Sequence, residues 1–226
     1  FENREDYEPD SLHGRRCWGG LDLSSTQDLT ALILRFEPTD TDPNWRLLPN
    51  FWLPAAGLDE KGKRDGVDYR TWVRQGWLET TPGAAIDKGF VLQRLAEMTA
   101  DYDLQTVGYD RWRIEDLKQM ADNEGIYIQF SPFGQGFKDM APAVDEFERR
   151  LLARLLKHNG NPVMTWCAAN TVVDTDAAGN RKPTKHKSTG RIDGIVAAVM
   201  AVGQTLGQEA VNIDDFLNDP VFGSAA

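Results

Sequence analysis

Cysteine is scarce in this sequence of 226 residues. The two cysteines, Cys17 and Cys167, lie far apart and lack the spacing of a metal site. This usage is typical of a reduced cytoplasmic protein rather than a disulfide-stabilised secreted one. No apolar run approaches the roughly 20 residues of a membrane-spanning helix, and no signal peptide is visible. The sequence therefore predicts no membrane partner.

A phosphate-binding motif of the form Gly-x-x-x-x-Gly-Lys-Ser/Thr is also missing, so the chain should not hydrolyse nucleotides as a P-loop enzyme does. No internal repeat is evident. Positive charge is in deficit, because 25 Lys and Arg face 35 Asp and Glu for a net charge of -10. Taken alone, this balance argues against nucleic-acid binding. The local distribution of charge matters more than the sum, however.

The hydrophobic content of 41% suits one globular domain with excursions. The first residue is Phe1 instead of Met, and we expect the chain to be an excised or processed piece. Residues 1–16 are polar and aperiodic, which predicts a linker from a preceding domain. We expect residues 17–207 to form the domain and residues 208–226 to form an acidic C-terminal tail.

Three apolar runs in close succession, separated by turn-forming residues, predict an antiparallel meander over residues 17–23, 29–36 and 45–53. Helices and strands then alternate. We expect helices over 69–76, 86–101, 112–123, 138–158 and 190–206, strands over 104–110 and 126–132, and two strands or one hairpin over 161–186. This order predicts an α/β fold whose mixed sheet is antiparallel at one side, parallel elsewhere and flanked by helices.

Three carboxylates stand where an apolar element meets its end. Asp22 lies between two leucines on the first expected strand, Asp110 closes the strand "LQTVGYD", and Asp193 enters the helix "RIDGIVAAVMAVG". That helix is nearly all apolar and should be buried. Its glycine and alanines leave one side thin enough for close packing on a sheet. Such packing would carry Asp193 towards Asp22 and Asp110.

Each acid alone has an ordinary explanation. Asp22 is able to cap a turn, Asp110 to cap the next helix, and Asp193 to gain from a helix dipole. The combination favours a shared site. Clustered carboxylates repel, so a bare cluster is unfavourable. A divalent cation removes that cost, and hard oxygen ligands suit Mg²⁺ or Mn²⁺. Two such ions roughly 4 Å apart support phosphodiester hydrolysis.

Four stretches in this order, "GLDLSSTQDLTAL", "RDGVDYRTWVRQGWLETTPG", "VGYDRWR" and "RIDGIVAAVMA", resemble the nuclease domain of tailed-phage terminase large subunits. The resemblance runs from about Trp18 to Gly203. It implies a ribonuclease H-like fold and a metal-dependent endonuclease that cuts concatemeric double-stranded DNA during genome packaging, with little sequence preference. Carried over by position, Asp22, Asp110 and Asp193 match the metal-binding and catalytic acids.

The resemblance also implies partners: double-stranded DNA, a packaging ATPase domain in the intact protein, a small terminase subunit and the portal of the procapsid. The expected location is the host cytoplasm, with transient binding at the portal. Because the chain is acidic, we expect the isolated domain to bind DNA weakly. The ATPase domain or another packaging partner would then hold the DNA.

The most basic stretch, "NRKPTKHKSTGR", leads directly into Asp193. Phosphate contacts normally come from such residues; a solvated, flexible loop is the alternative. Asp28 and His186 are secondary candidates as metal ligands, against a turn acid and a solvated histidine. The predicted DNA contacts are Lys182, Lys185, Lys187, Arg191 and Arg113.

Two other functions fit the same pattern. One is a different ribonuclease H-like nuclease, such as a Holliday-junction resolvase or a hybrid-specific ribonuclease. The other is a catalytically silent domain that docks on the portal or the small subunit. A substrate panel and substitution of the three acids discriminate among them.

Overall fold

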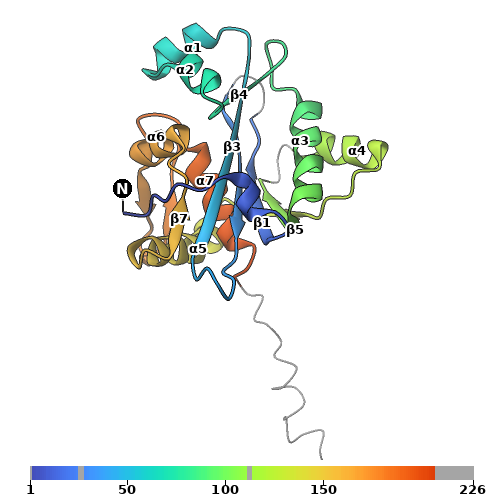
Figure 1. Cartoon of the computed structure of the whole chain (residues 1–226). Coiled ribbons are helices and arrows are strands. Elements are labelled where there is room, and N and C mark those ends of the chain that lie inside the picture. The colour runs from blue at the N-terminus through green and yellow to red at the C-terminus, as the bar shows by residue number, and fades with distance from the viewer. Residues whose placement is uncertain (1, 25–27, 111–113, 207–226) are drawn as a thin grey trace, which may run out of the picture.

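The computed structural model describes residues 2–24, 28–110 and 114–206 (Figure 1). Within these ranges a seven-stranded sheet has the order β4-β3-β2-β1-β5-β6, with β7 paired to β3. Its strands are β1 (Arg16–Asp22), β2 (Thr30–Phe36), β3 (Trp45–Pro54), β4 (Glu79–Thr81), β5 (Asp103–Tyr109), β6 (Phe130–Pro132) and β7 (Leu156–His158). A separate hairpin consists of β8 (Val173–Thr175) and β9 (Arg181–Pro183).

The sheet is mixed, as predicted. β1, β2 and β3 pair antiparallel in chain order and form the expected meander. β5 pairs parallel with β1 and β6, and β4 and β7 pair parallel with β3. β1 is therefore central: it has an antiparallel neighbour on one side and a parallel neighbour on the other.

Helices cover both faces of the sheet (Figure 1). α5, α6 and α7 lie on one side, and α3 and α4 lie on the other. The helices are η1 (Pro9–Leu12, a 3₁₀ turn), α1 (Leu58–Asp65), α2 (Tyr69–Arg74), α3 (Lys88–Asp101), α4 (Glu115–Glu124), α5 (Phe137–Leu152), α6 (Pro162–Asn170) and α7 (Asp193–Gly203).

The two faces produce two apolar clusters, and β2 contributes to both. Every residue of β2 is buried. Ala31 and Ile33 belong to the cluster with α7, whereas Leu32 and Leu34 belong to the cluster with α3. A strand covered on both faces reads as a continuous apolar run, as β2 does. Each fully buried Leu or Ile side chain contributes about 1.5–3 kcal/mol.

The helix expected over residues 138–158 is shorter than predicted. α5 ends at Leu152, and Arg154 adopts a left-handed conformation with φ of 61°. Residues Leu156–His158 instead form β7, paired with Trp45–Leu47 of β3. Leu156 is buried there, whereas Leu152 is 76% exposed. The apolar residues of 138–158, which predict one continuous helix, thus belong to two elements, the end of α5 and strand β7.

The stretch expected to form two strands or one hairpin begins with a helix instead. α6 spans Pro162–Asn170, and Asn161 caps it by accepting hydrogen bonds from the backbone N–H groups of Val163 and Met164. Asn followed by Pro is a local helix-start signal, and it prevails here over the strand-like apolar pattern. The hairpin itself is correct but shorter: β8 and β9 flank the turn at residues 176–180.

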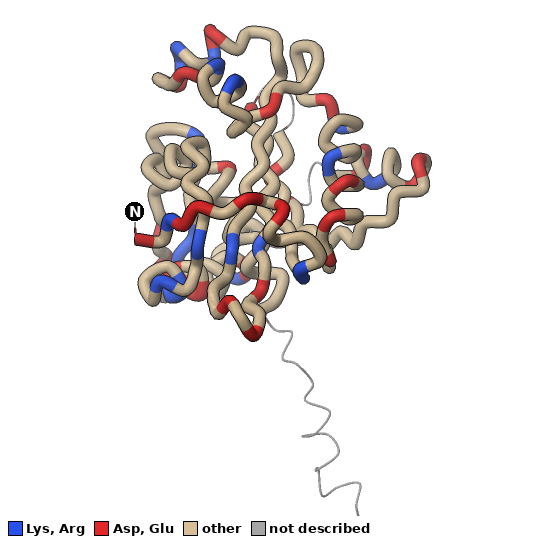
Figure 2. Tube along the Cα trace, viewed as in Figure 1, with Lys and Arg blue, Asp and Glu red and all other residues tan. Residues whose placement is uncertain are grey.

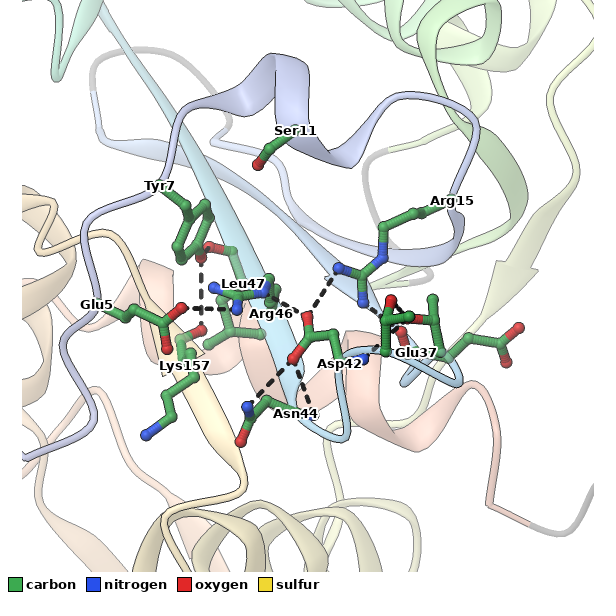
Figure 3. Close-up of polar contacts among 12 residues, drawn as sticks. Glu5, Tyr7, Ser11, Arg15, Glu37, Asp42, Asn44, Arg46, Leu47 and Lys157 are labelled. Carbon is green, nitrogen blue, oxygen red and sulfur yellow. Dashed lines mark hydrogen bonds and ion pairs between the residues drawn. The ribbon is translucent and has the colours of Figure 1, made fainter.

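The N-terminal segment packs on the sheet, although its sequence is that of a linker. Leu12 is fully buried, and the backbone N–H of Glu5 donates to the carbonyl of His158 at 3.0 Å. Figure 3 shows the side-chain network that fastens it. The hydroxyl of Tyr7 donates to the carbonyl of Leu47 at 2.5 Å. Whether this segment connects to another domain stays a prediction.

Among the helices described, none combines the length and the apolar character needed to cross a membrane.

Candidate functional site

Asp22 is the last residue of β1 and is only 8% exposed. Leu21 and Leu23 belong to the apolar cluster on the α3 side of the sheet. Because side chains alternate along a strand, Asp22 faces the opposite side, where α7 packs. The orientation of β1 thus explains why a carboxylate stands between two core leucines.

Asp110 lies beside Asp22 because of the parallel pairing of β1 and β5. Leu21 pairs with Tyr109, and the next residue along each strand is an aspartate. Both carboxylates therefore lie at the same edge of the sheet. Asp110 also follows β5 directly, as predicted.

Asp193 begins α7, and the helix packs directly on β1. A side chain at Gly20 has no room: its Cβ would lie 2.0 Å from the carbonyl oxygen of Ala197 and 2.6 Å from the nitrogen of Ala201. This close approach confirms the predicted thin face of the helix. The start of α7 then brings Asp193, 6% exposed, to the end of β1.

Lys185 joins two of the three acids. Its Nζ donates to Oδ2 of Asp22 and to Oδ1 of Asp193, each at 2.7 Å. Burial and the neighbouring charge of Asp193 raise the pKa of Asp22 to about 7, against the opposing effect of Lys185. Burial would lower the pKa of Lys185, but the charges of both carboxylates outweigh it and raise this pKa. Asp110 adds to the raised pKa of Asp22.

Two cavities adjoin this cluster, and Asp22 and Lys185 line both. The first, of about 190 Å³, is also lined by Asp193 and Asp28. The second, of about 280 Å³, is also lined by Asp110, Gln135, Lys182 and His186. The Lys185 side chain thus stands between two polar spaces that share one carboxylate.

The donor set suits a hard divalent cation. Within the described ranges, no three Asp, Glu, His or Cys side chains already converge as a complete metal-ligand cluster. Asp22 and Asp193 nevertheless converge on one ammonium group, which shows that a cation fits between them. Asp110 shares the second cavity with Asp22. Carboxylate oxygens are the ligands that Mg²⁺ and Mn²⁺ prefer, so the residues fit such an ion.

Arg191, which the sequence predicts as a DNA contact, has a largely buried side chain that pairs with two carboxylates. Its side chain is 12% exposed and pairs with Asp28 at 2.8 Å and with Asp65 at 2.7 Å. Tyr69 also donates to Asp65, at 2.7 Å. Burial would lower the pKa of Arg191, but its hydrogen bonds to the two carboxylates raise it. Asp65 and Tyr69 were missed, because no local signal connects them to a residue about 120 positions away.

The other predicted contacts lie at varying distances from the acids. The Nζ of Lys182 donates to the carbonyl of Gln135 at 3.3 Å beside the second cavity. His186 lines that cavity with an exposed ring, whereas Asp28 lines the first. Lys187 points elsewhere and pairs with Asp174 at 2.7 Å. Arg113 lies outside the described residues.

Comparisons with known proteins identify the family. A family described as "Terminase large subunit, endonuclease domain" matches residues 4–209. The large terminase subunit of Enterobacteria phage HK97 is 46% identical over 210 residues, which are 92% of this chain and 41% of that protein. Protein YmfN of Escherichia coli K12 is 25% identical over 222 residues, covering 94% of this chain and 47% of that protein. The chain thus spans less than half the length of these relatives.

Solved structures give the same answer for the fold. The crystal structure of the HK97 large terminase has a TM-score of 0.80 at 48% identity, covering 85% of this chain and 40% of that one. The large terminase nuclease from thermophilic phage G20c, with bound magnesium, has a TM-score of 0.53 at 15% identity, covering 88% of this chain and 85% of that one.

A mixed sheet of this order, with helices on both faces, defines a ribonuclease H-like α/β domain. The chain belongs to the family of terminase large-subunit endonuclease domains.

Proposed function

We propose that this domain hydrolyses phosphodiester bonds of double-stranded DNA, with Mg²⁺ or Mn²⁺ held by Asp22, Asp110 and Asp193. The observation that carries the proposal is the excess of buried negative charge at one edge of the sheet. Asp22 and Asp193 are buried there and share the single ammonium group of Lys185, and Asp110 lines the same cavity as Asp22. Two cations held at this site would activate a water and stabilise the leaving oxygen.

The residues around the two cavities would have different roles. Asp22 borders both cavities, so it would hold a cation together with Asp193 beside the first cavity and together with Asp110 beside the second. Lys182 and His186 line the second cavity, where a cationic side chain is able to orient a phosphate and an imidazole to carry a proton.

The substrate follows from the family. We propose that the domain cuts concatemeric viral DNA during packaging in the host cytoplasm. A packaging ATPase domain, a small terminase subunit and the portal of the procapsid would be its partners. Lys and Arg are interspersed with Asp and Glu along the described chain (Figure 2). Because Asp and Glu outnumber Lys and Arg by 35 to 25, weak DNA binding by the isolated domain is expected, and the family resemblance implies little sequence preference. The ATPase domain would then hold the DNA.

Plasmid cleavage by the 226-residue chain tests this function. Supercoiled plasmid should be nicked and linearised with Mn²⁺ or Mg²⁺ and remain intact in EDTA. Full cutting in EDTA would contradict the proposal. A panel of duplex, four-way junction and RNA–DNA hybrid substrates should show cutting of the duplex, whereas preference for junctions or hybrids would support a different ribonuclease H-like enzyme.

Metal binding gives an independent measurement. Mn²⁺ relieves the repulsion among the three acids and should raise the melting temperature of the wild type, because a ligand that binds only the folded state stabilises it. The Asp22→Asn variant should lose most of that increase.

DNA affinity tests the proposed role of the ATPase domain. Nanomolar DNA affinity of the isolated chain at physiological salt would contradict that role.

A further inference from the structure

Lys185 occupies the place between Asp22 and Asp193 that a cation would take. Its ammonium group lies 2.7 Å from an oxygen of each carboxylate. A divalent cation bound to the same two oxygens would face the positive charge of this ammonium at close range. At separations of roughly 3–4 Å in a buried site, two positive charges repel strongly. The Asp22–Asp193 pair can therefore hold either the Lys185 ammonium or a divalent cation, but not both.

The attachment of Lys185 permits it to leave. About half of its side chain is exposed (53%), although the side chains of Asp22 and Asp193, taken without their backbone, are only 12% and 8% exposed. Four flexible methylene groups connect the ammonium to the backbone. The backbone itself is held on either side of Lys185, because Thr184 N–H donates to the carbonyl of Val172 and the Ser188 hydroxyl donates to the carbonyl of Thr184. The side chain can thus swing out while the loop stays in place.

The charge balance favours such an exchange. One ammonium leaves a net negative charge on Asp22 and Asp193, and Asp110 adds a further carboxylate nearby. A divalent cation would neutralise the pair completely. The metal-free protein keeps the pair partly neutralised, which limits the cost of burying two carboxylates.

We propose that Lys185 is an internal cation that occupies the Asp22–Asp193 pair in the metal-free domain and is displaced when a divalent cation binds. The inference rests on the proposed metal-dependent function. A consequence is that Lys185 becomes available to a DNA phosphate only after the metal has bound.

A matched pair of lysines allows a direct test. Lys187 lies in the same loop, pairs with Asp174 at the same distance of 2.7 Å and has a side chain that is 59% exposed, but Asp174 lines neither of the two cavities beside Asp22. Lys185→Met and Lys187→Met each remove one charge and keep a flexible, unbranched apolar side chain. Mn²⁺ binding would be measured by calorimetry without DNA, at a mildly alkaline pH where carboxylates are ionised.

Lys185→Met should bind Mn²⁺ about tenfold more tightly or better, a change of about 1.4 kcal/mol, because no ammonium has to leave. Lys187→Met should bind as the wild type does. Equal or weaker binding by Lys185→Met would overturn displacement. Absence of binding to both the wild type and Lys185→Met would instead contradict the proposed metal site, so the two failures are distinguishable.

Melting temperatures with and without Mn²⁺ test whether Lys185 leaves the acids when the metal binds. In EDTA, Lys185→Met should melt below the wild type, whereas in saturating Mn²⁺ the two should melt together, since Lys185 no longer contacts the acids. A deficit that persists unchanged in Mn²⁺ would show that Lys185 stays bound and would refute the proposal.

Wild-type protein provides a readout that requires no substitution, in case Lys185→Met does not fold. Amine acylation of Lys185, quantified by mass spectrometry relative to Lys187, should rise when Ca²⁺ is added. An ammonium held between two carboxylates is protected, whereas a displaced one reacts as an ordinary lysine. An unchanged ratio in Ca²⁺-loaded protein would contradict displacement.

Discussion

Two charge clusters in this molecule use the same residue types with opposite results. In the first, Asp42 accepts hydrogen bonds from Arg15 at 2.9 Å and Arg46 at 2.6 Å, and Arg46 also pairs with Glu5 (Figure 3). Burial would raise the pKa of Asp42, but these hydrogen bonds outweigh it and hold the pKa well below its usual range. This cluster has two guanidinium groups for two carboxylates.

In the second cluster, Asp22 and Asp193 share the ammonium group of Lys185, and Asp110 is a further carboxylate beside Asp22. Burial and the charge of Asp193 raise the pKa of Asp22 to about 7, and Lys185 only partly opposes them. The two clusters differ in charge balance more than in the type of residue, and we propose that this balance separates a structural cluster from a metal-binding one. The balanced cluster fastens the N-terminal segment to the sheet. The unbalanced cluster keeps negative charge that Lys185 does not compensate, and a metal ion would neutralise it.

The largest expected effect is the loss of catalysis in the unbalanced cluster. Asp22→Asn, Asp110→Asn and Asp193→Asn should each lower the rate of plasmid cutting by roughly a thousandfold or more, equivalent to about 4 kcal/mol, because each removes a charged oxygen ligand. Rates in Mn²⁺ measure the change, and circular dichroism checks the fold. Full activity in all three variants would assign the cutting to a contaminant.

The balanced cluster should behave in the opposite way. Asp42→Asn leaves Arg15 and Arg46 without their shared carboxylate and should lower the free energy of unfolding by about 2–3 kcal/mol. Urea denaturation measures this loss. Mn²⁺ affinity should stay unchanged, because the cluster lies away from the acids of the site.

Asp40→Asn is the matched control for that change. Asp40 lies in the same turn but is exposed, so its substitution should alter the free energy of unfolding by less than about 0.5 kcal/mol. If Asp42→Asn were as mild as Asp40→Asn, or if it weakened Mn²⁺ binding, the distinction between the two clusters would fail.

The parts of the site that the sequence could predict depend on local pattern. Alternation around Asp22 indicated its face, and the small residues near Asp193 indicated a helix pressed against the sheet. Gly20, which tolerates no side chain against Ala197, is the matching feature on the strand. The meander also followed from local pattern, because apolar runs separated by turn formers predict paired strands.

The parts that escaped prediction depend on contacts between distant segments. Lys185 was expected to contact phosphate, but its pairing with Asp22 joins residues 163 positions apart. The partner of Arg191, Asp65, is 126 positions away. Strand β7 exists because Leu156–His158 meets the edge of β3, which no local spacing reveals. Helix α6 was different, since Asn161 and Pro162 offered a local signal.

The third expected effect concerns pH. A carboxyl group whose pKa is raised on folding contributes stability below its unfolded pKa and loses it as pH rises through the folded pKa. For Asp22 that window runs from the ordinary aspartate pKa of 3.8 to a pKa of about 7, raised by burial and Asp193, with Asp110 adding to the rise and Lys185 opposing it. Asp42, with its lowered pKa, loses stability only at more acidic pH.

Unfolding of the wild type and Asp22→Asn in EDTA measures this window. Between about pH 5 and about pH 8, the stability of Asp22→Asn relative to the wild type should increase by about 2 kcal/mol, since each pKa unit corresponds to about 1.4 kcal/mol. A constant difference across this range would show that Asp22 is already ionised at low pH and that the cluster is balanced after all.

The smallest expected effect comes from a pair with the same distance as the site but ordinary surroundings. Lys187 and Asp174 lie 2.7 Å apart, as Lys185 and Asp22 do, but are 59% and 31% exposed. A double-mutant cycle with Lys187→Met and Asp174→Asn should give a coupling energy close to zero, because water and salt screen an exposed pair. The equivalent cycle on Lys185 and Asp22 in EDTA should give a larger value. Equal couplings would mean that distance alone sets the strength of these contacts, and the excess charge around Asp22 would then have no energetic consequence.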